Sequence, residues 1–194
     1  MSEKLEQLKL TGAGELVVIS GVSGCGKTTL AKKLAAKHKI YVLSVDDCKD
    51  ELGMQYGFLT EYEKKIFNDT AKRLFKLQCI THMRTQDSII VEYPFSQDWQ
   101  EFFTECARGY GYKLIVINLV VKDFERAYCV RAARDRQSDR SEVLLCDVWI
   151  PDNICHHATD ADVRDHMYAQ WSSADTTQLV GDETYDVDCE EELW

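Results

Sequence analysis

Glycine, lysine and threonine residues with the spacing of a phosphate-binding loop occur near the start of the chain. Residues 21–28 read G-V-S-G-C-G-K-T and fit the P-loop (Walker A) pattern G-x-x-x-x-G-K-[ST]. Glycines let the backbone curl until successive N–H groups point at phosphate oxygens, and the N-terminus of a following helix adds its positive end. In such a loop Lys27 reaches the β- and γ-phosphates, and the Thr28 hydroxyl ligates Mg²⁺. The pattern therefore predicts that the chain binds a nucleoside triphosphate.

The nucleotide contacts expected from this loop extend one residue beyond the motif. They are Gly21, Val22, Ser23, Gly24, Cys25, Gly26, Lys27, Thr28 and Thr29. We expect the Cys25 side chain to face outward rather than to act as an oxidation-sensitive thiol.

A pair of carboxylates follows the second predicted strand, at 40–45. Asp46 and Asp47 lie where the carboxyl end of a parallel strand meets the ligand-binding edge of an α/β sheet. A carboxylate there can orient, or take a proton from, a hydroxyl that attacks the γ-phosphate. Lys49 lies three residues after Asp46, on the same face of an incipient helix, and can hold the substrate. The alternative is that Asp46 caps a short helix over 47–52, and both roles are compatible.

Glu92 ends the third predicted strand, at 88–92, and the chain then runs into Tyr93 and Pro94. A single acid at this place suits support of Mg²⁺ through water, and we assign it with Asp47 and Lys49 to the substrate side of the site. The alternative is a strand-end carboxylate that caps the following turn.

Arginines are concentrated after the strand expected at 113–121, in a helix that begins near Asp123. They are Arg126, Arg131, Arg134, Arg136 and Arg140. Arg131 and Arg134 share a helical face, and guanidinium groups stabilise phosphoryl oxygens whose charge develops in the transition state. Asp135 and Asp139 interleave with them and can neutralise some as surface pairs. We expect one or two of these arginines to be functional.

The remaining segments alternate between strand and helix patterns. Residues 16–20 form a continuous apolar run before the loop, typical of a strand buried on both faces, and residues 28–39 have helical apolar spacing. A last strand is expected at 184–187. A helix begins at the Thr60 capping box, and another begins at Asp98. The inward stripe of the first is expected to consist of Ile66, Phe67, Ala71, Leu74, Leu77 and Ile80. The alternation predicts one α/β domain over residues 1–194, with helices on both faces of a parallel sheet.

Composition and charge restrict the classes of partner. The chain has 194 residues, of which 45% are hydrophobic and 29% charged, and no apolar run long enough to span a membrane. Its N-terminal segment is polar, so we expect a cytoplasmic protein. The net charge is −10, and the part from Ser141 to Trp194 has fourteen acidic residues against one basic residue, Arg164. Such a surface repels polyanions and weighs against nucleic acid as the main partner.

The cysteines and histidines give no metal motif. The eight cysteines form no C-x-x-C pair, and we expect them to be free thiols. Cys155, His156 and His157 are the densest cluster of potential ligands, but adjacent residues on one short segment rarely reach the same ion.

Four segments together resemble the small P-loop kinases, a group that includes polynucleotide 5′-kinase domains, zeta-type toxins and chloramphenicol phosphotransferase. They read GVSGCGKTTLAKKLA, SVDDCKDEL, IIVEYPFS and FERAYCVRAARDR, and the resemblance covers about residues 16–140. It implies ATP and Mg²⁺, a three-layer α/β sandwich with strand order 2-3-1-4-5, and an arginine-bearing lid at about 126–145. By position, Asp46 is the catalytic base, and Arg131, Arg134 or Arg136 belongs to the lid. The acid at Glu92 departs from the aspartate common in this group, and the acidic part 141–194 matches no motif.

Three functions fit these residues. The leading hypothesis is an ATP-dependent phosphotransferase that acts on a hydroxyl of a small molecule, with Asp46, Lys27, Arg131 and Arg134 as catalytic residues and Arg136 at the nucleotide. The second is a kinase for polynucleotide 5′-hydroxyls, against which the acidic surface argues. The third is an ATP-binding regulatory protein with little turnover.

Overall fold

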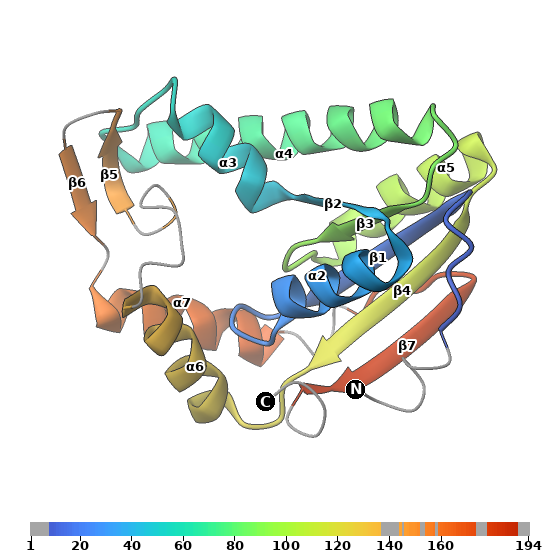
Figure 1. The fold of residues 1–194 in the computed structure, drawn as a ribbon. Helices are drawn as coiled ribbons and strands as arrows, with labels where there is room; N and C mark the ends of the chain where they lie inside the picture. The colour runs from blue at the N-terminus through green and yellow to red at the C-terminus, as the bar shows by residue number, and fades with distance from the viewer. Residues whose placement is uncertain are drawn as a thin grey trace.

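A five-stranded parallel sheet forms the centre of the protein (Figure 1). The computed structural model describes residues 8–136, 144, 146–151, 154–157, 159–173 and 178–189. The strand order is β2-β3-β1-β4-β7, so the predicted order 2-3-1-4-5 is confirmed, with β7 as the fifth strand of the sheet along the chain. The strands are β1 (Glu15–Gly21), β2 (Tyr41–Ser44), β3 (Ile89–Glu92), β4 (Lys113–Val120) and β7 (Glu183–Asp188).

Helices cover both faces of this sheet, which confirms the three-layer α/β architecture. Helices α4 and α5 pack with one core cluster, and α2 packs with the other. The helices are α2 (Lys27–His38), α3 (Val45–Gly53), α4 (Glu61–Met83), α5 (Gln100–Tyr110), α6 (Phe124–Arg136) and α7 (Asp160–Ser173), with a 3₁₀ turn at Gln97–Trp99 before α5.

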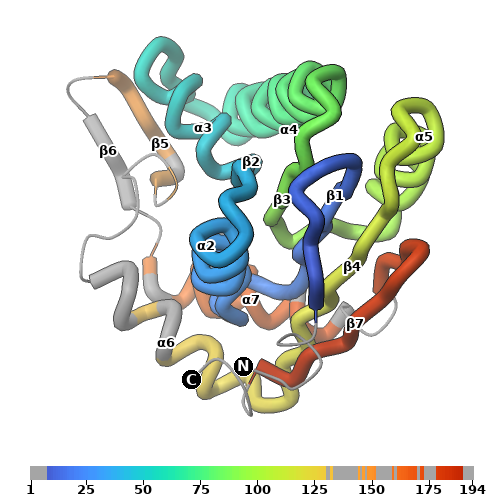
Figure 2. The backbone as a smooth tube through the Cα atoms, turned by 45° about the vertical axis from the view of Figure 1, so that its right-hand side comes forward, coloured from blue at the N-terminus to red at the C-terminus, as the bar shows by residue number. Residues whose placement is uncertain are grey.

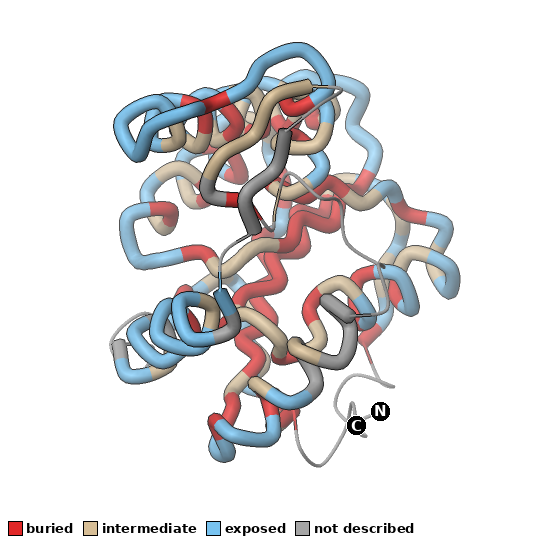
Figure 3. The backbone as a smooth tube through the Cα atoms, turned by 90° about the vertical axis from the view of Figure 1, so that its left-hand side faces the viewer, coloured by how far each residue is buried: buried red, intermediate tan, exposed pale blue. Residues whose placement is uncertain are grey.

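Buried residues run through the centre of the molecule (Figure 3), and the central strand β1 is buried from Glu15 to Ser20. Leu16 and Val18 contribute to the cluster under α4 and α5, whereas Val17 and Ile19 contribute to the cluster under α2. A strand covered on both faces needs apolar side chains in both directions, which is why this segment reads as a continuous apolar run. Each fully buried aliphatic side chain of this size contributes about 1.5–3 kcal/mol relative to an exposed one.

Helix α4 begins at the predicted capping box of Thr60 and Glu63, and its predicted inward stripe is confirmed only in part, at Phe67 and Ala71. The buried residues are Phe67, Ala71, Phe75, Cys79 and Met83, four residues apart. Ile66 and Leu77 are 50% and 62% exposed, so the prediction that they face inward is wrong. Leu77 lies about 200° around the helix from Phe75, because each residue turns the helix by roughly 100°.

The acidic C-terminal part contributes to the domain at three places. A hairpin of β5 (Cys146–Ile150) and β6 (Ile154–His157) contacts the segment before α4, where Phe58 and Trp149 exchange backbone hydrogen bonds of 2.7 and 2.9 Å. Helix α7 lies beside α6 (Figure 2), and β7 pairs with β4. Within the described ranges, no helix has the length and apolarity to cross a bilayer.

The cysteines do not all match the expectation of free thiols. Cys25, Cys48, Cys79, Cys106, Cys129 and Cys189 are free, and all but Cys129 are buried. Cys146 is instead disulfide-bonded, so the prediction is wrong there. The side chains of Cys155, His156 and His157 lie outside the described residues. The described part of the chain has no group of three or more His, Cys, Asp or Glu side chains that could hold a metal ion.

Candidate active site

The P-loop joins the end of β1 to the start of α2, as predicted. Gly21, Gly24 and Gly26 have φ angles of +145°, +84° and +93°, a region that glycine adopts without steric cost. A Cβ atom on Gly21 would lie 2.6 Å from the carbonyl oxygen of Leu119 on β4 and 2.8 Å from Cys25 Sγ. The backbone conformation and the close approach to β4 therefore both require glycine at position 21.

Lys27 is the first residue of α2, and its side chain folds back across the loop. Its Nζ donates hydrogen bonds to the carbonyl oxygens of Gly21 at 2.9 Å and Val22 at 2.7 Å. The residue is 7% exposed. A buried ammonium ion bonded to loop carbonyls is a strong local positive charge, and it can exchange these carbonyls for the oxygens of a bound phosphate.

Thr28 and Glu92 form the polar contact expected beside a magnesium ion. Thr28 Oγ1 donates to Glu92 Oε1 at 3.1 Å. Burial raises the pKa of the Glu92 carboxyl, an effect that the Lys27 ammonium group partly opposes. A threonine hydroxyl backed by a buried carboxylate fits an Mg²⁺ ion, which prefers oxygen ligands and keeps several waters. Glu92 is not among the residues that line the pocket described below, and its assignment to the substrate side stays a prediction.

The prediction that the Cys25 side chain faces outward is wrong, because Cys25 is fully buried beneath the loop. Its sulfur accepts a hydrogen bond from the thiol of Cys189, immediately after β7. Burial acts to raise the pKa of the Cys25 thiol, but this hydrogen bond and the Lys27 ammonium group outweigh it and lower the pKa. The missing side chain of Gly21 leaves the space that the sulfur occupies.

The end of β2 brings the predicted base and a lysine together. Ser44, not Asp46, caps α3: its hydroxyl accepts from the backbone N–H of Asp46 at 3.1 Å, and the helix begins at Val45 rather than at 47. Lys49 Nζ lies 3.2 Å from Asp46 Oδ1 and 3.4 Å from the hydroxyl of Tyr93. Burial acts to lower the pKa of Lys49, but the Asp46 carboxylate outweighs it and raises the pKa. Asp47 is exposed on the first turn of α3.

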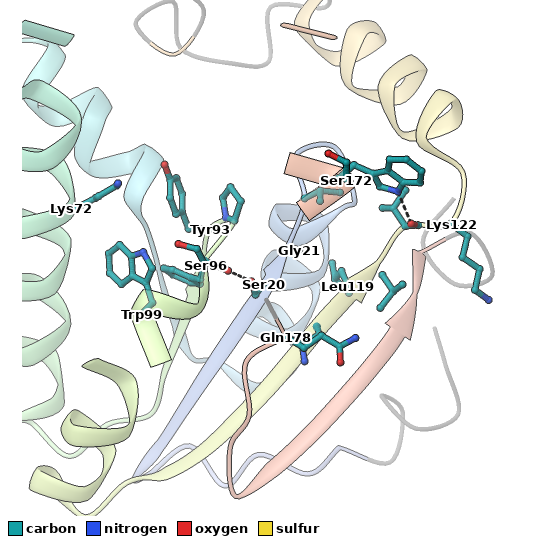
Figure 4. Close-up of a pocket in the computed structure, with 17 residues that line it drawn as sticks. Ser20, Gly21, Lys72, Tyr93, Ser96, Trp99, Leu119, Lys122, Ser172 and Gln178 are labelled. Atoms are coloured by element: carbon teal, nitrogen blue, oxygen red, sulfur yellow. Dashed lines mark hydrogen bonds between the residues drawn. The ribbon is translucent and has the colours of Figure 1, made fainter. Parts of the chain in front are cut away.

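A pocket of about 720 Å³ opens at the carboxyl ends of β1, β3 and β4 (Figure 4). Tyr93 lines it, and its hydroxyl joins the pocket to Lys49 and Asp46. Gly21 and Val22 of the P-loop line the same pocket, whereas Asp46 and Lys49 do not line it and are connected to it through Tyr93. The lining residues are Ser20, Gly21, Val22, Lys72, Tyr93, Pro94, Phe95, Ser96, Trp99, Asn118, Leu119, Val120, Val121, Lys122, Trp171, Ser172 and Gln178.

Sequence reasoning missed most of this pocket. Tyr93, Ser96 and Trp99 follow β3, and the rule that ligands bind beyond the carboxyl ends of parallel strands could have identified them. Lys72 on α4 has no such signal, because lysine in a helix is ordinarily a solvated residue. Trp171 of α7 donates from Nε1 to the carbonyl of Val121 at 2.9 Å, so the acidic C-terminal part closes one end of the pocket.

The arginines predicted for the lid lie on helix α6. Arg131, Arg134 and Arg136 belong to α6, and their side chains lie outside the described residues, as does all of Arg140. Arg126 is exposed, and its backbone N–H donates to Asp123 Oδ1 at 3.1 Å at the start of the helix. Of the lid expected at 126–145, the structure describes the helical part together with residue 144.

Comparisons with known proteins agree with this fold. A family model for an AAA domain, AAA_33, matches residues 16–148. A candidate kinase from Chloroflexus aurantiacus J-10-fl has a TM-score of 0.71 at 19% identity, over 94% of this chain and 92% of that one. A gluconokinase from Sinorhizobium meliloti 1021 has a TM-score of 0.50 at 12% identity, over 91% and 83% of the two chains.

A chain of the Pnkp1/Rnl/Hen1 RNA repair complex has a TM-score of 0.58 at 12% identity, over 89% of this chain and 49% of that one. No curated protein matches the sequence. At these identities the structural likeness establishes a shared fold.

Proposed function

The chain belongs to the AAA_33 family of AAA domains, and on that premise we propose that it transfers the γ-phosphate of ATP to a hydroxyl of a small molecule. One observation carries the proposal. Asp46 is linked through Lys49 to Tyr93, a residue of the pocket that also reaches Gly21 and Val22 of the P-loop. A candidate base, a phosphate-binding loop and a cavity of small-molecule size therefore adjoin one another.

The proposed reaction is an in-line transfer. The acceptor hydroxyl gives its proton to the Asp46 carboxylate while its oxygen forms a bond to the γ-phosphorus, the bond from that phosphorus to the bridging oxygen breaks, and ADP leaves. Lys49 holds the Asp46 carboxylate in place, since its ammonium group lies 3.2 Å from Oδ1. Lys27 neutralises charge on the phosphates. We assign Arg131 and Arg134 to the charge of the transferred group and Arg136 to the nucleotide.

Mg²⁺ belongs to the proposal as the metal ion of the donor. The Thr28 hydroxyl would ligate it, and the Glu92 carboxylate would accept hydrogen bonds from the waters bound to the ion. The ion would supply positive charge to the phosphate oxygens. A cytoplasmic location, where ATP and Mg²⁺ are available, completes the proposal.

The test is ADP formation from ATP and Mg²⁺ with a panel of hydroxylated metabolites. Asp46→Asn is expected to lower turnover by about 10²- to 10⁴-fold while the affinity for ATP stays within twofold, because an amide cannot take the proton. Asp69→Asn, which changes an exposed acid on α4, is the matched control and should keep full turnover. Unchanged turnover in Asp46→Asn would remove the base from the proposal.

Two other outcomes point to the alternative functions. Tight ATP binding without ADP formation on any acceptor supports a regulatory ATP-binding protein. Phosphorylation of an oligonucleotide 5′-hydroxyl in preference to every small molecule supports a polynucleotide kinase.

A further inference from the structure

The charge of the acceptor pocket differs from that of the whole protein. The chain has 33 acidic and 23 basic residues, yet the pocket lining contains two lysines and no acid. A cavity with only positive side chains in a protein of net charge −10 favours an anionic ligand, because each buried or half-buried cation is stabilised by an opposite charge.

The two pocket lysines are not equivalent. Lys122 is ion-paired with Asp188, with 2.5 Å between Nζ and Oδ2, and its side chain extends away from the cavity (Figure 4). Lys72 is half-buried and extends from α4 toward Tyr93, and no carboxylate among the described residues pairs with it. One turn farther along α4, Lys76 lies over the rings of Trp99 and Phe102 at 4.7 and 4.8 Å, so that neighbour is engaged in packing.

The other walls of the pocket indicate the shape of the ligand. Tyr93, Trp99 and Trp171 supply flat apolar surface, and Gln178 supplies an amide. The Ser96 hydroxyl donates to Asp98 Oδ1, so its proton is not available to the ligand. Asn118 is already engaged, because its amide donates to Leu179 O and Asp186 Oδ1, both at 3.0 Å. A ligand in this pocket therefore has the Lys72 ammonium group at one end and the P-loop at the other.

Resting on the proposed function, we propose that the phosphate acceptor is a small hydroxylated anion. Its carboxylate or phosphate group binds Lys72, and its hydroxyl lies toward Val22 and Asp46. The same arrangement disfavours cationic acceptors, which would bring a second positive charge to Lys72, and neutral acceptors, which leave Lys72 without a partner.

The first experiment compares related acceptors with and without an anionic group. ADP formation is measured with gluconate against glucose, shikimate against its methyl ester, and ribose 5-phosphate against ribose. We expect the anion of at least one pair to have the higher kcat/KM by about tenfold or more, since a charge-assisted hydrogen bond is lost in the neutral member. A preference within the gluconate or shikimate pair indicates that the pocket binds a carboxylate, and a preference within the ribose pair indicates that it binds a phosphate. Equal use of both members of every productive pair overturns the inference and leaves the proposed function standing, whereas preference for an oligonucleotide overturns both.

The second experiment assigns the preference to Lys72. Lys72→Met should raise the KM for the anionic acceptor by about 10- to 100-fold and leave the KM for ATP unchanged. Lys65→Met removes the same charge from an exposed position of α4 and should change neither constant. Lys72→Arg should retain most of the affinity. Equal behaviour of Lys72→Met and Lys65→Met contradicts the assignment.

A binding measurement keeps the inference testable if no acceptor is phosphorylated. With the P-loop saturated by a non-hydrolysable ATP analogue and Mg²⁺, titration with the three anions should change the tryptophan fluorescence, because Trp99 and Trp171 line the pocket. The change should be lost in Lys72→Met. Saturable binding of this kind without ADP formation would support the pocket assignment and remove the kinase proposal. Absence of binding by all three anions overturns the inference.

Discussion

The two halves of the candidate site are built differently. The donor half lies at the end of the central strand β1, and its groups are held mainly by the backbone: Lys27 by loop carbonyls and Gly21 by its contact with β4. The acceptor half lies where β2, β3 and α4 converge, and it is held by contacts between side chains such as Asp46, Lys49 and Tyr93. Backbone geometry tolerates few substitutions, whereas side-chain contacts can be exchanged one at a time. The difference suggests that the donor is fixed and the acceptor is the variable part.

The largest expected loss of kcat/KM comes from a substitution in the donor half. Lys27→Met removes the charge that faces the phosphates and should lower kcat/KM by about 10²- to 10³-fold, by the same factor for every acceptor. Steady-state kinetics with two productive acceptors checks this. A loss that depends on the acceptor would mean that Lys27 also contacts the acceptor and that the two halves are not separate.

A second prediction tests whether the backbone holds the donor half. Gly21→Ala should lower the free energy of unfolding by about 1–3 kcal/mol and weaken ATP binding, because its Cβ meets the Leu119 carbonyl oxygen in a strained backbone conformation. Gly109→Ala is the matched control: it lies in α5 with open space around it, and alanine should stabilise the helix by about 0.5–1 kcal/mol. Urea unfolding measures both. Equal effects at the two glycines would contradict the role given to the loop backbone.

A third prediction concerns the acceptor half. Tyr93→Phe removes the hydroxyl 3.4 Å from Lys49 Nζ and keeps the ring that lines the pocket. Loss of this hydrogen bond should lower kcat by about three- to tenfold, with little change in the affinity for ATP. Isothermal titration with ATP and turnover assays distinguish the two quantities. A larger loss of ATP affinity than of turnover would show that Tyr93 belongs to the donor half of the site.

The smallest effect is a change in the pH dependence of stability. Because burial raises the pKa of Glu92, the folded protein holds this proton more tightly than the unfolded chain does. The contribution of Glu92 to stability is therefore complete below the ordinary value of 4.5 and is lost as the pH rises through the raised pKa.

Unfolding of the ligand-free protein between about pH 4 and 8 checks this sign. Glu92→Gln should become more stable relative to the wild type as the pH rises, whereas Glu101→Gln, an exposed substitution on α5, should track the wild type. A parallel pH profile for Glu92→Gln and the wild type would show that the Glu92 carboxyl has an ordinary pKa.

The P-loop of the donor half and the Asp46–Lys49 pair of the acceptor half were predictable from the sequence because their contacts are local. Gly21 to Thr28 are consecutive, and Asp46 and Lys49 are three residues apart on one helix. Most of the acceptor half was not predictable, because Lys72, Tyr93 and Trp171 come from distant segments that only the folded sheet brings to one pocket. The inward position of Cys25 was missed for the same reason: its partner, Cys189, follows the last strand of the sheet. The alternative role of Asp46 as the cap of a short helix is wrong, because Ser44 caps α3.

The contact between Cys25 and Cys189 has a consequence for the order of events during synthesis. The P-loop leaves the ribosome early, but the side chain beneath it finds its partner only after β7 has been made. Until then β4 is an unpaired sheet edge, of the kind that recruits other strands. The P-loop of the nascent chain therefore stays incompletely packed through most of translation. We expect the nucleotide-binding loop to be among the last parts of the domain to reach its final structure.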